Sequence, residues 1–131
     1  MQRTVLLFVC LLGLATSAAA AEAGPIDRAL MKLGPEERAH QACVIKGIET
    51  VRKDKRLRQA DRMKTGSIHP AQFTGSLVTA TGGAVRMQHR WYALKFTCAV
   101  TEDQMKATSF TFELGDEIPK EKWEDYGLWD G

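Results

Sequence analysis

Two of the three cysteines, Cys43 and Cys98, are the residues of this chain best suited to chemistry. A catalytic thiol needs a neighbouring base, and the sequence assigns none to either cysteine. A zinc site needs four ligands, yet no CxxC or HxxxH spacing places His40, His69 or His89 beside a thiol. The remaining interpretation is a disulfide between the two.

The histidines and carboxylates give no further catalytic group. The three histidines are spread over 49 positions, and His40 is predicted to lie on the exposed side of a helix. Two acidic pairs, Asp116 with Glu117 and Glu124 with Asp125, are adjacent in the sequence, so their side chains point apart and read as solvated surface. We therefore predict no catalytic residue, no metal site and no cofactor.

Residues 1–21 have the pattern of a secretory signal peptide. Arg3 provides a short positive region, Val5 to Thr16 an apolar run of twelve residues, and a stretch rich in alanine a cleavage zone ending at Ala21. The apolar run is shorter than the roughly 18 residues of a spanning helix, so no stable membrane insertion is expected after cleavage. Residues 22–131 are then expected to form one periplasmic or secreted domain. Cys10 lies in the signal peptide and is removed with it.

Export supports the disulfide, because thiols pair in oxidising compartments. A bond between Cys43 and Cys98 closes a loop of 98 − 43 = 55 residues. In the chain-entropy model such a loop stabilises the fold by about 4 kcal/mol, before native strain is subtracted.

An amphipathic helix is predicted to begin at Pro35, which suits a first helical position. Val44, Ile48 and Val51 recur at helical spacing over four to five turns, with Cys43 at the edge of their stripe. A shorter helix is expected just before, over residues 25–33.

Two neighbouring antiparallel strands are predicted over residues 91–100 and 105–114, joined by a turn at 101–104. In the first of them, Cys98 shares a face with Leu94 and Phe96. The disulfide would therefore join the long helix to the apolar face of the sheet.

The remaining segments are read from turn signals. Residues 53–74 are predicted to be a loop with one short strand around 62–68, and Gly82 with Gly83 a hairpin turn between two short strands. A short helix is expected after Pro119, placing aromatic side chains on the sheet edge. The predicted fold is α+β: an N-terminal helix packed on a small antiparallel meander of three to five strands, a short C-terminal helix and one disulfide.

Charge is balanced overall but unevenly distributed. Residues 46–64 carry a net charge of +5 and residues 113–131 a net charge of −5. Within the basic run, Arg56, Arg58 and Arg62 are candidate binding residues for an anionic envelope component, although a solvated surface is the commoner explanation. Nucleic acid is not an expected partner after export.

Trp91 is the fourth candidate binding residue. It neighbours Tyr92 in a strand, so the two side chains point to opposite faces, and only Tyr92 shares the face of Cys98. Trp91 is covered either by the C-terminal helix or by a partner, and an internal cover is the commoner outcome for a large aromatic side chain.

Four stretches of the chain resemble a known family. They are "LGPEERAHQACVIKGI", "LRQADRM", "RWYALKFTC" and "MKATSFTFELGDEIPKEKWEDYGL", which together span residues 33–128. In this order they resemble exported bacterial proteins that carry the domain of unknown function 930. The resemblance implies an exported envelope protein of Gram-negative bacteria with paired cysteines, and it implies no activity.

The sequence therefore predicts a small soluble exported domain that acts as a binding or envelope-associated accessory protein. Its partner would be an anionic envelope component or another envelope protein. The alternative is an enzyme or enzyme inhibitor whose site is built by loops.

Overall fold

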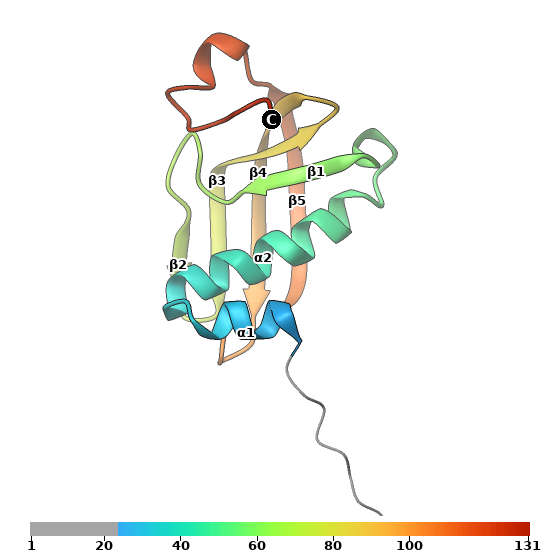
Figure 1. The fold of residues 1–131 in the computed structure, drawn as a ribbon. Helices are drawn as coiled ribbons and strands as arrows, with labels where there is room; N and C mark the ends of the chain where they lie inside the picture. Colours follow the sequence, from blue (N-terminus) through green and yellow to red (C-terminus); the bar gives the residue numbers. More distant parts are fainter. Residues whose placement is uncertain (1–23) are drawn as a thin grey trace, which may run out of the picture.

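The structure is a computed structural model that describes residues 24–131. The predicted signal peptide and the site of its cleavage lie outside the described residues. Two helices, α1 (Pro25–Met31) and α2 (Pro35–Val51), lie across one face of a five-stranded antiparallel sheet (Figure 1). The predicted α+β class, with helices packed on an antiparallel sheet, is confirmed.

Helix α2 starts and packs as its sequence dictates. Gly34 is the N-cap, Pro35 occupies the first turn, and Glu36 and Glu37 place carboxylates at the positive end of the helix dipole. At Gly47 the helix lies so close to the sheet that a Cβ atom would come within 2.8 Å of the Phe110 ring. A small residue is required at this crossing point.

The sheet has the order β1-β3-β4-β5, and β2 pairs with the other half of the outer edge of β3. The strands are β1 (Ala60–Lys64), β2 (Gln72–Thr74), β3 (Leu77–Met87), β4 (Arg90–Val100) and β5 (Ala107–Glu117). The segment predicted as a loop with one short strand over 62–68 therefore holds two short strands, with the first beginning two residues earlier. A 3-10 turn, η1 (Lys55–Leu57), connects α2 to β1.

The hairpin predicted at Gly82 and Gly83 is wrong. Both residues lie inside the continuous strand β3, where the register with β4 shifts between Ala80 and Gly83, so one extra residue forms a bulge. The true reversal follows at Gln88 and His89, which both have positive φ, 52° and 63°. This pair of angles is typical of a two-residue type I′ turn.

The helix-facing side of the sheet holds the larger core. Fifteen buried residues of the described chain form it, including Val78, Leu94 and Phe96 from the strands. The disulfide joins Cys43 of α2 to Cys98 of β4 across this layer, with the two Cα atoms 6.0 Å apart. The predicted pairing and its role between helix and sheet are confirmed.

A second, smaller core lies on the opposite face, under the C-terminal segment. Its five buried residues are Ala84, Trp91, Ile118, Trp123 and Leu128. The predicted C-terminal helix is reduced to a 3-10 turn, η2 (Lys120–Lys122), followed by an irregular chain that folds back over one end of the sheet (Figure 1). We call residues 118–131 the C-terminal cover.

Candidate functional site

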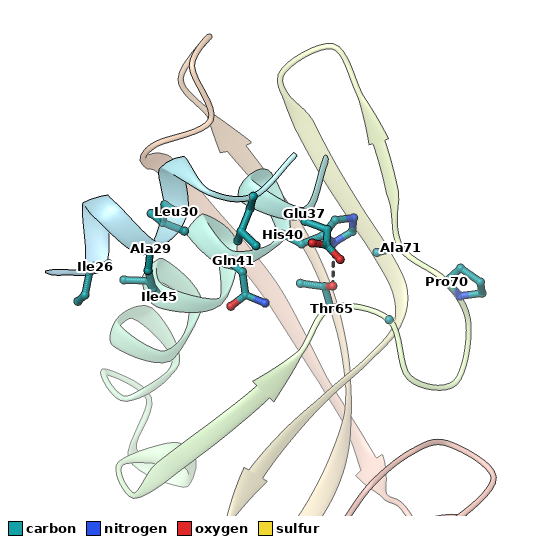
Figure 2. Close-up of a pocket in the computed structure, with 12 residues that line it drawn as sticks. Ile26, Ala29, Leu30, Glu37, His40, Gln41, Ile45, Thr65, Pro70 and Ala71 are labelled. Atoms are coloured by element: carbon teal, nitrogen blue, oxygen red, sulfur yellow. Dashed lines mark hydrogen bonds between the residues drawn. The ribbon is translucent and has the colours of Figure 1, made fainter. Parts of the chain in front are cut away.

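A cleft of about 670 Å³ opens between α1, α2 and the loop that joins β1 to β2 (Figure 2). Its volume lies within the roughly 300–1,000 Å³ range of small-molecule sites. The cleft is lined by Ile26, Ala29, Leu30, Leu33, Glu37, His40, Gln41, Ile45, Thr65, Gly66, Pro70 and Ala71.

Along one face of α2, the residues that line the cleft change from polar to apolar. Glu37, Gln41 and Ile45 are spaced four residues apart, so their side chains lie one above the other along the helix. Ile45 is 46% exposed, and Ile26 of α1, which lines the same cleft, is 61% exposed. Two large apolar side chains thus remain open to solvent at one end of a concave surface, whereas the polar groups gather at the other end.

Arg38 fixes α1 in place beside α2. Its guanidinium donates hydrogen bonds to the carbonyl oxygens of Leu30, at 3.0 Å, and Leu33, at 2.9 Å, which lie at the C-terminal end of α1 and just after it. A third bond, 2.9 Å long, reaches the carbonyl oxygen of Asp103 in the turn between β4 and β5. The half-buried Arg38 therefore ties the end of α1 both to α2 and to the turn between β4 and β5.

The bulge in β3 fixes the opposite wall. The carbonyl oxygen of Gly82 accepts hydrogen bonds from the backbone N–H groups of Ser67, at 2.9 Å, Ile68, at 2.8 Å, and His69, at 3.4 Å. A Cβ atom on Gly82 would overlap the backbone of His69. Glycine at this position lets the loop sit directly on the strand, with Pro70 just beyond it facing the cleft.

The sequence predicted His40 on the exposed side of its helix, and the structure places it elsewhere. It faces the cleft with its side chain 19% exposed, and its Nδ1 atom lies 2.8 Å from the Thr65 hydroxyl oxygen. Its register, three residues after Glu37 and one before Gln41, turns it toward the loop. His40 and Thr65 form the polar end wall and join α2 to the loop.

The arrangement suits binding better than acyl transfer. A hydroxyl beside an imidazole has the outline of a nucleophile with its base, but such a base is normally oriented by a third group within hydrogen-bonding distance. The nearest carboxylate to His40 Nε2 belongs to Glu36, at 3.8 Å, beyond the length of a hydrogen bond. Within residues 24–131, no three His, Cys, Asp or Glu side chains gather closely enough to hold a metal ion.

The predicted basic residues lie elsewhere, at the end of α2 and on the adjoining strand. Arg56 and Arg58 flank Leu57 of η1, and Arg62 is on β1, and all three arginines are exposed. Arg56 is paired with Asp54 through two side-chain bonds of 3.1 and 2.7 Å. Together with the Arg56 backbone N–H, these bonds lower the pKa of Asp54 to about 2. Arg62 donates to the carbonyl oxygen of Asp61.

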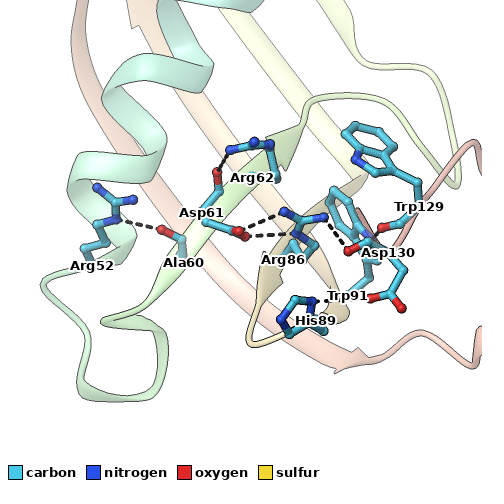
Figure 3. A network of polar contacts seen from close by, with 9 residues as sticks. All are labelled: Arg52, Ala60, Asp61, Arg62, Arg86, His89, Trp91, Trp129 and Asp130. Atoms are coloured by element: carbon cyan, nitrogen blue, oxygen red, sulfur yellow. Dashed lines mark hydrogen bonds and ion pairs between the residues drawn. The ribbon is translucent and has the colours of Figure 1, made fainter.

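Trp91 is fully buried beneath the C-terminal cover, and its ring presents no surface to a partner. Its Nε1–H donates to the carbonyl oxygen of Trp129 at 2.8 Å (Figure 3). Beside it the Arg86 guanidinium, only 4% exposed, makes two bonds to the Asp61 carboxylate and one to the carbonyl oxygen of Asp130. The bonds from Arg86 hold the pKa of Asp61 below its usual range. This network is a structural fastening.

The oppositely charged segments that the sequence revealed are not paired through their carboxylates. In the described part of the chain, the polar contacts between them are backbone carbonyls: Lys64 reaches the carbonyl of Gly127 at 2.9 Å. The same ammonium lies 5.5 Å from the centre of the Trp129 ring. Among the described residues, the carboxylates of residues 113–131 therefore form no ion pair with the exposed arginines Arg56, Arg58 and Arg62.

Sequence reasoning missed the cleft because its residues come from three separate segments. The signal that was present is the series Glu37, Gln41 and Ile45, which continues an apolar helix stripe into a polar one. Two large exposed side chains, Ile26 and Ile45, were also readable as hydrophobic residues off the main stripe. The wall opposite α2 is the loop seated on Gly82, which no local pattern encodes.

The fold and the cleft define the class of the protein: a small α+β domain with a helix pair on one sheet face and a ligand-sized cleft beside that pair. No described helix is long and apolar enough to cross a membrane. The chain belongs to the family of the Domain of Unknown Function (DUF930), whose sequence profile matches residues 30–128. Searches of curated proteins and of solved structures both returned no match.

Proposed function

We propose that this chain is an exported binding protein of the cell envelope, and that the cleft between α1, α2 and the loop after β1 is its ligand site. The ligand is a small amphipathic molecule. The observation that carries the proposal is the pair Ile26 and Ile45, two large apolar side chains left 61% and 46% exposed on the wall of one cleft. Exposed apolar surface in a concave site marks a binding function.

Export is supported by two independent features. The N-terminal sequence has the three regions of a secretory signal. The disulfide between Cys43 and Cys98 belongs to proteins of oxidising compartments. Both agree with an envelope location.

The test is a titration of the disulfide-bonded protein with N-phenyl-1-naphthylamine, an uncharged probe that fluoresces in apolar surroundings. We expect saturable binding of one probe per chain. Replacing Ile45→Gln removes an apolar wall without adding charge and should weaken probe binding about tenfold, because the buried contact area is lost.

Met31→Gln is the matched control. Met31 is 62% exposed at the end of α1, but it does not line the cleft. This variant should bind the probe as the parent protein does. Equal affinities in the parent and in Ile45→Gln, or the same loss in both variants, would contradict the proposal.

A second surface merits its own test. Exposed Arg58 and Arg62, together with the neighbouring lysines at the end of α2, form a field that an anionic envelope component can bind. Co-sedimentation with vesicles containing an anionic phospholipid should fall when salt rises or when both arginines are changed to Gln. Binding unaffected by salt and by these changes would remove this second function.

A further inference from the structure

We infer that the ligand of the cleft is a cation: a small molecule with an apolar chain and an ammonium head, and not an acyl anion. This inference rests on the proposed function, since it assigns the charge of the ligand in the same site. Among the described residues that line the cleft, Glu37 is the one Asp, Glu, Lys or Arg side chain.

A second carboxylate reinforces the first. Glu36 lies next to Glu37 in the first turn of α2, and its Oε1 atom is 3.8 Å from Nε2 of His40, a residue of the polar end wall. The N-terminus of a helix contributes a partial positive charge of about half a unit. Two full carboxylates outweigh this partial charge at the first turn of α2.

Two cations near the cleft, Arg38 and Lys64, direct hydrogen bonds to other groups. The Arg38 guanidinium is occupied by three backbone carbonyls, those of Leu30, Leu33 and Asp103. Lys64, which precedes Thr65 in the chain, donates to the carbonyl oxygen of Gly127. An anionic head group placed at the end wall would therefore meet the Glu37 carboxylate, whereas the donor groups of these two cations bond to backbone carbonyls.

The shape of the site fits a chain with a charged head at one end. Glu37, Gln41 and Ile45 follow one another along α2, so a ligand lying along the helix passes from carboxylate to amide to apolar wall (Figure 2). The apolar chain would lie between Ile45 and Ile26. Its ammonium head would then reach Glu37 and the hydroxyl of Thr65.

The experiment compares three amphiphiles with the same dodecyl chain and different heads: dodecyltrimethylammonium, dodecyl maltoside and dodecanoate. Each is used below its micelle concentration to displace N-phenyl-1-naphthylamine, at about pH 8, where an ordinary histidine is neutral. We expect the cation to displace the probe at about one fifth of the concentration that the uncharged maltoside needs, because Glu37 is at the solvent-exposed rim and such pairs are weak. The anion should be the poorest competitor.

Glu37→Gln should remove most of the preference for the cation and leave displacement by the maltoside unchanged. The matched control is Glu49→Gln, the same change on the same helix at a carboxylate outside the cleft, paired with Lys46 at 3.6 Å. This variant should keep the full preference.

The outcomes separate the two claims. If the uncharged and cationic amphiphiles compete equally, or if Glu37→Gln keeps the preference, the charge assignment is overturned while the cleft remains a binding site. If the probe itself fails to bind, or if Ile45→Gln leaves its binding unchanged, the proposed function is overturned.

Discussion

The two faces of the sheet are closed by different means. On the helix side, fifteen buried residues of the described chain form the core, and a disulfide ties α2 to β4. On the opposite side, five buried residues lie under the C-terminal cover, which is held by polar contacts such as Trp91 Nε1–H to the carbonyl of Trp129. One side is fastened covalently over a broad core, and the other by hydrogen bonds over a narrow one.

The difference shows which side chains on each face remain exposed after the two cores have formed. The cover reaches Trp91 and Ala93 of β4, whereas Lys95 and Thr97 on the same face stay exposed. On the helix side the buried core lies beneath α2 and does not include Ile45, whose side chain stays exposed. An apolar side chain that the core does not need is available to a ligand.

Breaking the disulfide is the strongest way to disturb this contrast. The variant with Cys43→Ala and Cys98→Ala should lose about 4 kcal/mol of unfolding free energy, because the unfolded chain regains the freedom of a 55-residue loop. Urea unfolding followed by tryptophan fluorescence measures this loss. Reductant should lower the stability of the parent protein by the same amount and leave the variant unchanged; a parent protein indifferent to reductant would show that the helix side does not depend on its covalent bond.

Removing the carboxylate under Arg86 tests the polar fastening of the other face. Asp61→Asn leaves a buried guanidinium without its anion and should cost about 2 kcal/mol near neutral pH, a value reduced because Asp61 is itself partly exposed. The matched change Asp54→Asn removes the anion from Arg56, whose guanidinium is exposed to solvent, and should cost less. Equal effects of the two changes would show that burial of Arg86 contributes nothing.

The same pair predicts a pH dependence. The pKa of Asp61 in the folded protein lies below its unfolded value, so its contribution is fully present above about pH 4 and is lost as the pH falls through the folded pKa. The parent protein should therefore lose more stability in acid than Asp61→Asn does. Parallel stability curves for the two proteins between neutral pH and acid would contradict the assignment.

The smallest expected effect concerns the turn between β3 and β4, two strands of the sheet that both faces share. Gln88 and His89 adopt positive φ angles that asparagine and glycine adopt at lower cost. Gln88→Asn with His89→Gly should raise the unfolding free energy by about 1 kcal/mol. Thermal unfolding measures the gain, and Gln88→Asn alone should give a fraction of it. No gain would mean that the turn is not limited by its backbone angles.

The sequence was sufficient for elements with strong periodic patterns. The α2 helix, the β4 strand and the Cys43 to Cys98 bond follow from apolar spacing and cysteine count, and each is in the structure. The β3 strand was misread because Gly82 and Gly83 look like a turn, whereas they form a bulge required by close contact with another backbone. Long-range contacts of this kind leave no trace in a local window.

The candidate site was less predictable than the fold. The basic side chains Arg56, Arg58 and Arg62 are exposed, as charge implied, while Trp91 is enclosed by its own chain. His40 was read from its helix alone, and its partner Thr65 comes from a loop 25 residues later. A site assembled by three segments requires the tertiary structure.

Three amide protons, those of Ser67, Ile68 and His69, converge on the carbonyl oxygen of Gly82. The same loop donates from the Ser67 hydroxyl to the carbonyl oxygen of Tyr126 in the cover, at 2.7 Å, and lines the cleft through Pro70. Lifting the loop therefore exposes all three amides, opens the cleft and breaks one of the contacts that hold the cover. The rate at which these amide protons exchange with solvent deuterium would report how often the loop lifts. A ligand bound in the cleft would slow this exchange.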